Sequence, residues 1–597
     1  MATYLTHVDQ PTPLHKPNQA TSPTALQMNK PALSEKSKLA IETITKFTTQ
    51  EELKISHSPI ALQEPQIALS AIVRVSDLTY LYPEQASAGS NDPDTLLTHL
   101  TFGHNKALRL LLPPTIGNKG APLFQMNDLL FSWAHQVLIR CGQIAMAENW
   151  RDLLGDGTLK AVEVTDDSII LEPAPGSVGI EALESKDHRW LKQHQSNRYG
   201  AEWETLHAAE VEIRHQMGQV AFRWNDYFLG YNSTEEINDH FTKKGALLLA
   251  TKSGHDAFRP DSSFGGHSFR RYLAVIEILV GHMLSHVAFG QELFRHNPDL
   301  QPIDLMTMFF RIDDMAEELS NLLDIEQAIL EQILRTLTMA PSNNSRHTFV
   351  PGGPTPPFIE IANGMVLRSV RGMLDEPFFF MLKALRRSFE RDWDKAVYHR
   401  EKIFRDDIYS LFPQESIIKM QSNVRLRVQG QVVTDIDAIT LDLYTGEIGL
   451  FQLKWQDPFA TSMTERSSRK ANFLAEAQKW IDAVSKWVLE RGLEQLGKDL
   501  GLPAAKARNI SSAHLFVIGR NFAHFSSVEA PDERAAWGHW PQLVRLTTEH
   551  PGEKQSPIKW LHDTLKSDSP HNKPINFPSD HHEEIGGLSM QLRLNQN

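Results

Sequence analysis

Two apolar stretches joined by a short polar turn constrain the fold of this chain more than any other feature. Residues 432–443 and 448–455 are rich in β-branched and aliphatic side chains, and Tyr444-Thr445-Gly446-Glu447 lies between them. Such stretches around a glycine-containing turn predict the two antiparallel strands of a hairpin. We therefore expect a β-sheet in the C-terminal third of the chain.

The elements around this hairpin follow a definite order. A helical pattern covers residues 378–412, and a strand is predicted at 424–428. The run HLFVIG at 514–519 is typical of a strand that is buried on both faces. The order helix, three strands, helix, strand predicts an α/β domain. Its second helix has an apolar stripe made of Phe473, Ala477, Trp480, Ile481, Val484, Trp487 and Val488.

The larger part of the chain, residues 37–357, is predicted to be a mainly helical region, and no role can be assigned to it. A helix is predicted from Asp128 to Gly155, followed by a short hairpin. Proline and glycine crowd residues 341–357, where we place a loop or domain boundary. Helical spacing recurs at 200–250, 268–296 and 304–340, and the short hairpin pairs 159–164 with 169–172.

Neither end of the chain has apolar residues at the regular spacing of a helix or a strand. Residues 1–36 are rich in Thr, Pro, Gln, Asn and Ser, so we expect a disordered tail there. Residues 556–597 are rich in Ser, His, Asp and Pro, and we expect them to form a loose C-terminal tail.

Composition excludes several classes of protein. Of 597 residues, 41 % are hydrophobic, which is enough to bury sizeable cores and excludes wholesale disorder. The single cysteine, Cys141, cannot form an internal disulfide or a cysteine zinc site. A net charge of −13 argues against a protein that coats nucleic acid through bulk charge. A local basic surface remains compatible with this balance.

No segment suggests a membrane location. The N-terminus lacks the basic start and apolar core of a secretory signal. The most apolar stretch, 272–290, contains Glu277, His282 and His286, and ionisable groups are costly at the centre of a bilayer. We expect a buried helix, a cytoplasmic protein and no membrane partner.

Polar side chains gather on the predicted C-terminal hairpin. Side chains alternate across a strand, so Asp435 and Asp437 share one face, as do Gln452 and Lys454. A turn centred near 444–445 places Asp437 nearly opposite Gln452. Carboxylate and amide oxygens are the ligands that Mg²⁺ or Mn²⁺ prefers, and a nearby lysine can offset charge on a phosphate. The hairpin therefore predicts a divalent-cation site.

This pattern resembles the motif of a known nuclease superfamily. Asp437, fourteen intervening residues and then Gln452-x-Lys454 on paired strands resemble the PD-(D/E)xK motif, and more narrowly its Mrr-like QxK variant. The element order is similar to that of the restriction-endonuclease-like αβββαβ core. We accordingly take 378–555 as a nuclease-like domain that follows the large helical region.

The resemblance implies roles for individual residues. Asp437 and Glu401 would be metal ligands, Gln452 would be a neutral metal or water contact, and Lys454 would be the catalytic lysine. Glu401 fits the acidic residue expected on the preceding helix, because its spacing from Val397, Phe404, Ile408 and Leu411 puts it on the inward stripe. The role of Asp435 stays open.

The sequence also departs from the superfamily pattern. The proline of its name is absent, and Gln452 brings no charge to a metal. A second interpretation is an ordinary exposed hairpin face with a cross-strand polar cluster. Glu401 could likewise be a boundary residue that pairs with Arg405, one turn later.

Cationic side chains flank the hairpin on both sides. They could contact phosphates beside the site, or they could simply form solvated faces. The candidate nucleic-acid contacts are Arg425, Arg427, Arg466, Arg469 and Lys470.

The main hypothesis is a Mg²⁺- or Mn²⁺-dependent nuclease that hydrolyses phosphodiester bonds, most simply a DNA endonuclease. Analogy with the superfamily suggests prokaryotic antiviral defence or DNA maintenance. The helical region would then recognise the substrate, a partner protein or a second copy of the chain. The alternative is a catalytically inactive nuclease-fold protein that acts as a nucleic-acid-binding or scaffold component. A third hypothesis is a zinc hydrolase that uses His282 and His286, which lie four residues apart on one helix.

Overall fold

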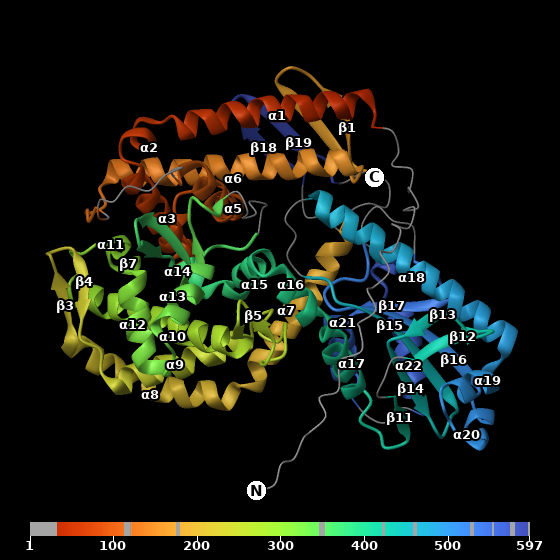
Figure 1. Ribbon diagram of the computed structural model, residues 1–597. Coiled ribbons are helices and arrows are strands. Elements are labelled where there is room, and N and C mark those ends of the chain that lie inside the picture. Colours follow the sequence, from red (N-terminus) through yellow and green to blue (C-terminus); the bar gives the residue numbers. More distant parts are fainter. Residues whose placement is uncertain are drawn as a thin grey trace, which may run out of the picture.

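The computed structural model divides the chain into a helical lobe and a smaller lobe built around a mixed sheet (Figure 1). It describes residues 33–112, 120, 122–174, 179–344, 353–420, 424–457, 463–525, 531–551, 555–573 and 580–594. Most of the predicted N-terminal tail and the centre of the predicted break at 341–357 lie outside these residues.

The buried centre of the helical lobe is α10 (Phe269–His296), the most apolar helix. By length and composition it could span a membrane, but 67 % of its most apolar window is buried inside the lobe. The predicted buried helix is therefore confirmed. Around it lie α8 (Gly200–Val220), α9 (Glu235–Ala250), α11 (Pro302–Met306), α12 (Ile312–Leu323), α13 (Gln327–Thr336) and α14 (Val370–Leu374).

Shorter elements complete this lobe. A second core joins α3 (Pro65–Leu81), α5 (Pro93–Leu111) and α6 (Asp128–Asp156). The short helices α2 (Pro59–Gln63) and α4 (Pro83–Ala86) flank α3, whereas α7 (Ile180–Arg198) packs against α21 (Trp540–Glu549) of the other lobe. The strands are β3 (Ala221–Trp224), β4 (Phe228–Tyr231), β5 (Ser263–Phe264), β6 (His267–Ser268), β7 (Met308–Arg311), β8 (Thr338–Met339), β9 (Phe358–Ala362) and β10 (Met365–Arg368).

The C-terminus returns to the helical lobe, so the predicted loose tail is wrong for the described residues. Strands β18 (His581–Ile585) and β19 (Leu588–Leu592) join β1 (Leu159–Val164) and β2 (Ser168–Pro173) in one sheet, beside α1 (Glu35–Ser56) (Figure 1). Ile585, Leu588 and Met590 are buried in this layer. β19 of this hairpin pairs with β2, which lies more than 400 positions earlier in the chain. Because the pairing is so distant in sequence, the local sequence of the C-terminus does not predict the hairpin.

The smaller lobe is a three-layer α/β arrangement. Its sheet has the order β11-β14-β15-β16-β17; β11, β14 and β15 are antiparallel neighbours, whereas β15, β16 and β17 run parallel. Helix α18 (Met463–Arg491) packs on one face, and α17 (Arg400–Ser410), α21 (Trp540–Glu549) and α22 (Pro557–Ser567) cover the other. The strands are β11 (Ile417–Lys419), β14 (Ala438–Asp442), β15 (Glu447–Lys454), β16 (Ser512–Gly519) and β17 (Ala535–His539). Two short helices, α19 (Leu493–Asp499) and α20 (Ala504–Arg508), precede β16.

The single strand predicted at 432–443 is in fact two strands. β13 (Gln431–Ile436) pairs only with β12 (Val424–Val428) in a separate ribbon, and β14 enters the main sheet. The chain changes partners at Asp437. Two tryptophans of α18 hold the ribbon, since Trp480 Nε1 donates to Asp435 O (2.8 Å) and Trp487 Nε1 donates to Arg427 O (3.1 Å).

The boundary between the lobes also differs from the prediction. The helical stretch 378–412 consists of α15 (Pro377–Ser388), α16 (Glu390–Tyr398) and α17. The apolar side chains of α15 and α16 belong to the core around α10, whereas Phe404 and Ile408 of α17 pack under the sheet. The sheet lobe therefore begins near residue 400 and includes α22, so neither end of the predicted 378–555 domain matches.

A buried arginine joins the two lobes. Arg400 lies over the rings of Phe258 and Trp393 of the helical lobe, donates to the carbonyl of Ala257 (3.0 Å) and pairs with Asp457 (2.7 Å). The loop before α10, which carries Ala257 and Phe258, is thus part of the interface between the lobes.

Candidate functional site

The tight turn after β14 sets the register of the site. Gly446 has φ +72°, and a side chain there would collide with the carbonyl of Asn509. The turn pairs Ala438 with Phe451 and Ile439 with Leu450, which is the predicted register. Asp437 is thereby placed beside Gln452 and Leu453.

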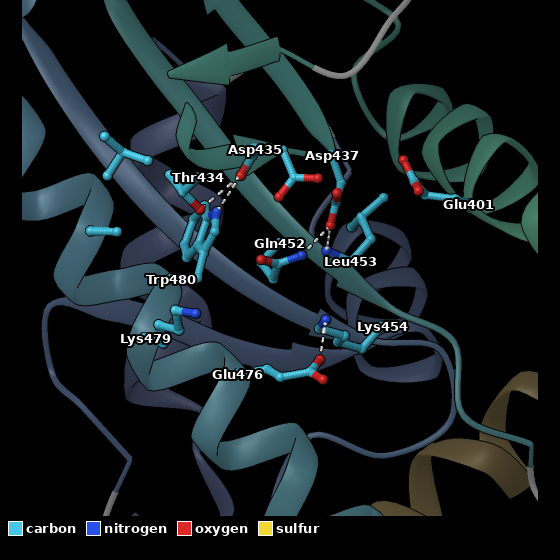
Figure 2. Close-up of a pocket in the computed structure, with 12 residues that line it drawn as sticks. Glu401, Thr434, Asp435, Asp437, Gln452, Leu453, Lys454, Glu476, Lys479 and Trp480 are labelled. Atoms are coloured by element: carbon cyan, nitrogen blue, oxygen red, sulfur yellow. Dashed lines mark hydrogen bonds and ion pairs between the residues drawn. The ribbon is translucent and has the colours of Figure 1, made fainter. Parts of the chain in front are cut away.

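One pocket of about 400 Å³ brings the predicted site residues together (Figure 2). It lies where the ribbon leaves the sheet, between β13, the end of β15, α17 and α18. Four of its lining residues, Glu401, Asp437, Gln452 and Lys454, were predicted as the catalytic set from sequence. Asp435 also lines it, so the shared face predicted for the two aspartates survives the break between β13 and β14.

The carboxylate of Asp437 is firmly anchored in this pocket. Its Oδ2 accepts hydrogen bonds from the backbone N–H of Leu453 (2.7 Å) and from the side-chain amide of Gln452. Asp437 is only 5 % exposed. Burial raises its pKa to about 7, and the nearby Glu401 and Asp435 act in the same direction. Such a group is stabilised by a cation placed among the carboxylates.

Glu401 differs from its predicted environment. Its side chain is 38 % exposed and pairs with Arg405 (2.7 Å), so the predicted inward-facing position is wrong, and the alternative of a boundary residue paired with Arg405 is the one observed. The apolar stripe behind the prediction fails because Val397 belongs to α16, which ends before Glu401. Arg405 also donates to the backbone carbonyl of Asp437, so it links Glu401 to the strand.

Lys454 points into the pocket but is paired there. Its Nζ lies 2.6 Å from Glu476 Oε2 on α18, and the two side chains are 26 % and 62 % exposed. An ion pair this accessible to water contributes only about 0–1 kcal/mol, so another anion can displace the glutamate at little cost.

Only some of the cationic side chains predicted to contact nucleic acid lie exposed beside the pocket. Arg425 and Arg427 are exposed on β12, and Arg425 pairs in register with Asp435, beside the pocket. Arg469 is half-buried and donates to the carbonyl of Asp457 (3.2 Å), and Lys470 is half-buried on α18. The side chain of Arg466 lies outside the described residues.

The histidines of α10 do not form a metal site with any described residue. His286 Nδ1 lies 3.2 Å from the hydroxyl of Tyr231. Burial, together with the nearby Arg368, lowers the pKa of His286 to about 3 and that of His282 to about 4. Among the described groups of three or more potential ligands neither histidine occurs.

Sequence reasoning missed the contribution of α18 to the pocket. Glu476, Lys479, Trp480 and Ala483 line it at helical spacing. From sequence, Trp480 was assigned only to the apolar stripe of this helix. Glu476 and Lys479 lie beside that stripe, and charged residues in this position could have indicated that the helix borders the pocket.

Comparisons with known proteins do not classify the chain. It matches no protein-family model, no curated protein and no solved structure.

Proposed function

We propose that the Asp437 pocket hydrolyses phosphodiester bonds of nucleic acid with the help of Mg²⁺ or Mn²⁺, in the manner of the PD-(D/E)xK nucleases. One observation carries the proposal: a buried aspartate, three further carboxylates, an amide and two lysine ammonium groups line a single pocket. DNA is the proposed substrate, and prokaryotic defence or DNA maintenance is the proposed setting, by analogy with the superfamily.

The residues fit a hard divalent cation. Among the described residues, both donors to Asp437 bond Oδ2, so Oδ1 is the atom left for an ion. Asp437 would hold the cation, with Glu401 as the second carboxylate and Asp435 close by. Gln452 donates to Asp437 and so orients it, and its amide oxygen is a neutral ligand for the cation or for a water molecule.

The bound cation would polarise the phosphoryl oxygen and stabilise the departing oxygen. Lys454 would exchange its contact with Glu476 for the substrate phosphate and offset the charge that develops there. The ammonium would also orient the attacking water. Arg425 and Arg427, exposed on the neighbouring ribbon, would bind backbone phosphates and set the position of the strand.

A cleavage assay tests this proposal. The purified chain is incubated with single- and double-stranded DNA and RNA, with Mg²⁺ or Mn²⁺, alongside Asp437→Asn and Lys454→Ala. We expect each variant to lose about 100-fold or more in rate, the size of effect seen when one charge-stabilising group is removed from an active site. Lys486→Ala, which removes an exposed lysine of α18 that does not line the pocket, is the matched control and should change the rate little.

The inactive nuclease-fold alternative predicts a different result. Wild-type protein that binds nucleic acid but cleaves none of these substrates with either metal would support it and contradict the enzyme. The neutral Gln452 and the pairing of Lys454 with Glu476 are the features that this alternative explains directly.

A further inference from the structure

Three buried side chains from distant parts of the chain meet where α7 packs against the sheet lobe. Glu184 lies on α7, His524 follows β16, and His539 ends β17. They are 1 %, 2 % and 0 % exposed. One potential ligand atom from each lies within 4.8 Å of the others. Figure 1 shows α7 beside α21, the helix that continues directly from His539.

Several polar atoms of this cluster lack a hydrogen-bond partner. Glu184 Oε2, His524 Nε2 and both ring nitrogens of His539 are buried without one in the described structure. Buried polar groups are almost always paired, so several unsatisfied acceptors or donors in one place indicate a missing partner. Among them, His539 Nδ1 lies 3.5 Å from Glu184 Oε1, and an ion bound between these two atoms would supply the partner that this buried nitrogen lacks.

The carboxylate is oriented before any ligand arrives. Glu184 Oε1 accepts hydrogen bonds from the backbone N–H groups of Ala523 (3.0 Å) and His524 (2.9 Å). The same oxygen lies 3.1 Å from His524 Nδ1 and 3.5 Å from His539 Nδ1. Two ligands bound to zinc at about 2.0–2.1 Å with tetrahedral angles are about 3.3 Å apart. The two separations from Glu184 Oε1 therefore match the spacing of zinc ligands, and one ligand atom of each of the three residues lies within 4.8 Å of the others.

A second carboxylate supports one of the histidines. His539 Nε2 lies 3.5 Å from Asp187 Oδ2, one turn after Glu184 on α7, and Asp187 is itself paired with Arg545. A histidine that binds a metal through one nitrogen commonly directs the other toward a carboxylate, which fixes the ring. Asp187 is thus placed as a positioning residue for His539.

We propose that Glu184, His524 and His539 bind a zinc ion that fastens α7 to the sheet lobe. Two imidazoles and one carboxylate are ligands typical of zinc, whereas Mg²⁺ prefers oxygen ligands alone. Three protein ligands leave a fourth position for a water molecule. Because the ligands come from α7 and from the ends of two strands, binding of the ion and docking of the helix stabilise each other. This site is separate from the Asp437 pocket and does not depend on the function proposed for it.

The test uses the full-length protein. It is freed of metal with a chelator and titrated with Zn²⁺, and zinc content and thermal stability are measured. We expect one zinc per chain and a rise in the melting temperature that Asp437→Asn shows as fully as wild type, so that it does not arise from a cation in the Asp437 pocket. Hydrogen exchange of α7 and of the segment around His524 should slow when zinc is added. Protein that takes up no zinc and gains no stability from it would overturn the proposal, because the cluster would then be a metal-free network of buried side chains.

Substitutions test whether the zinc ion binds at these residues. His524→Gln and His539→Gln should abolish stoichiometric zinc binding, and Asp187→Asn should weaken it about 10- to 100-fold. His286→Gln is the matched control, because His286 is also buried with an unpartnered ring nitrogen but lies on α10, and this variant should keep its zinc. Retention of zinc by both cluster variants at wild-type affinity would contradict the assignment. The titration of the wild-type protein stays decisive if a variant fails to fold.

Discussion

The Asp437 pocket and the Glu184 cluster differ in both chemistry and construction. The polar groups that line the pocket are carboxylates, an amide and two lysines, and Gln452, Leu453 and Lys454 come from one strand. The cluster is fully buried, combines one carboxylate with two imidazoles, and joins positions 184, 524 and 539. An accessible oxygen site suits a hard cation that must meet a substrate, and a closed nitrogen-rich site suits an ion that stabilises the fold.

The largest expected effect separates the two sites by the metal each requires. Chelation of zinc should lower the melting temperature of the sheet lobe by about 10 °C, the shift for a ligand present at roughly a thousand times its Kd. Scanning calorimetry with added Zn²⁺ or Mg²⁺ measures it. Added Zn²⁺ should restore the lost stability in wild type and in Asp437→Asn alike, whereas cleavage should require Mg²⁺. Restoration of the stability of zinc-free Asp437→Asn by Mg²⁺ would contradict the division of roles.

The pH dependence of stability tests the buried carboxylate of the pocket. The folded pKa of Asp437, about 7, is above that of an unfolded aspartate, so its contribution is fully present below about pH 4 and is lost as pH rises through 7. Asp437→Asn stays neutral, and in Mg²⁺-free buffer it should become more stable than wild type above pH 7, by on the order of 4 kcal/mol. Denaturant unfolding at pH 5 and pH 8 measures this change.

Magnesium should remove this difference between the two proteins. A cation among the carboxylates stabilises ionised Asp437, so Mg²⁺ should stabilise wild type at pH 8 and leave Asp437→Asn unchanged. A variant that is less stable than wild type at pH 8 without Mg²⁺ would mean that the carboxylate is structural and needs no cation.

A smaller effect is expected at Glu401. This carboxylate is partly exposed and already paired with Arg405, so it can contribute less to cation binding than Asp437 does. Glu401→Gln should weaken Mn²⁺ binding about tenfold, which corresponds to about 1.4 kcal/mol. Calorimetric titration with Mn²⁺ measures it, and Glu390→Gln, a change on the neighbouring helix α16, is the control. An effect as large as that of Asp437→Asn would show that both carboxylates hold the ion equally.

The smallest effect is expected at Glu476. Its removal frees Lys454 from a solvent-accessible ion pair, so Glu476→Gln should change kcat/KM by about threefold or less. Steady-state cleavage kinetics measure this change. A loss as large as that of Lys454→Ala would mean that Glu476 belongs to the catalytic machinery.

Local geometry explains which parts of the site could be predicted. A four-residue turn fixes the register of a hairpin, so the approach of Asp437 to Gln452 and Lys454 could be predicted from their positions alone. Glu401 comes from a helix whose boundaries depend on two different cores. The division of 378–412 into three helices was therefore not visible, and the environment of Glu401 was mispredicted.

Tertiary pairing explains the remainder. The chain changes from the ribbon to the main sheet at Asp437, which no local pattern marks. The C-terminal hairpin is ordered by pairing of β19 with β2 and by the contact of Glu583 with His99 (2.8 Å). The Glu184 cluster has no sequence motif, because its spacing exists only after α7 docks on the ends of β16 and β17.

The central claim is that the buried Asp437 holds a divalent cation. The most direct test measures the binding of Mn²⁺ to zinc-loaded protein by electron paramagnetic resonance at pH 8. We predict that wild type binds Mn²⁺ at a site that Asp437→Asn lacks, while both proteins keep their zinc. Equal Mn²⁺ binding by wild type and Asp437→Asn would contradict the account, because the buried aspartate would then hold no cation.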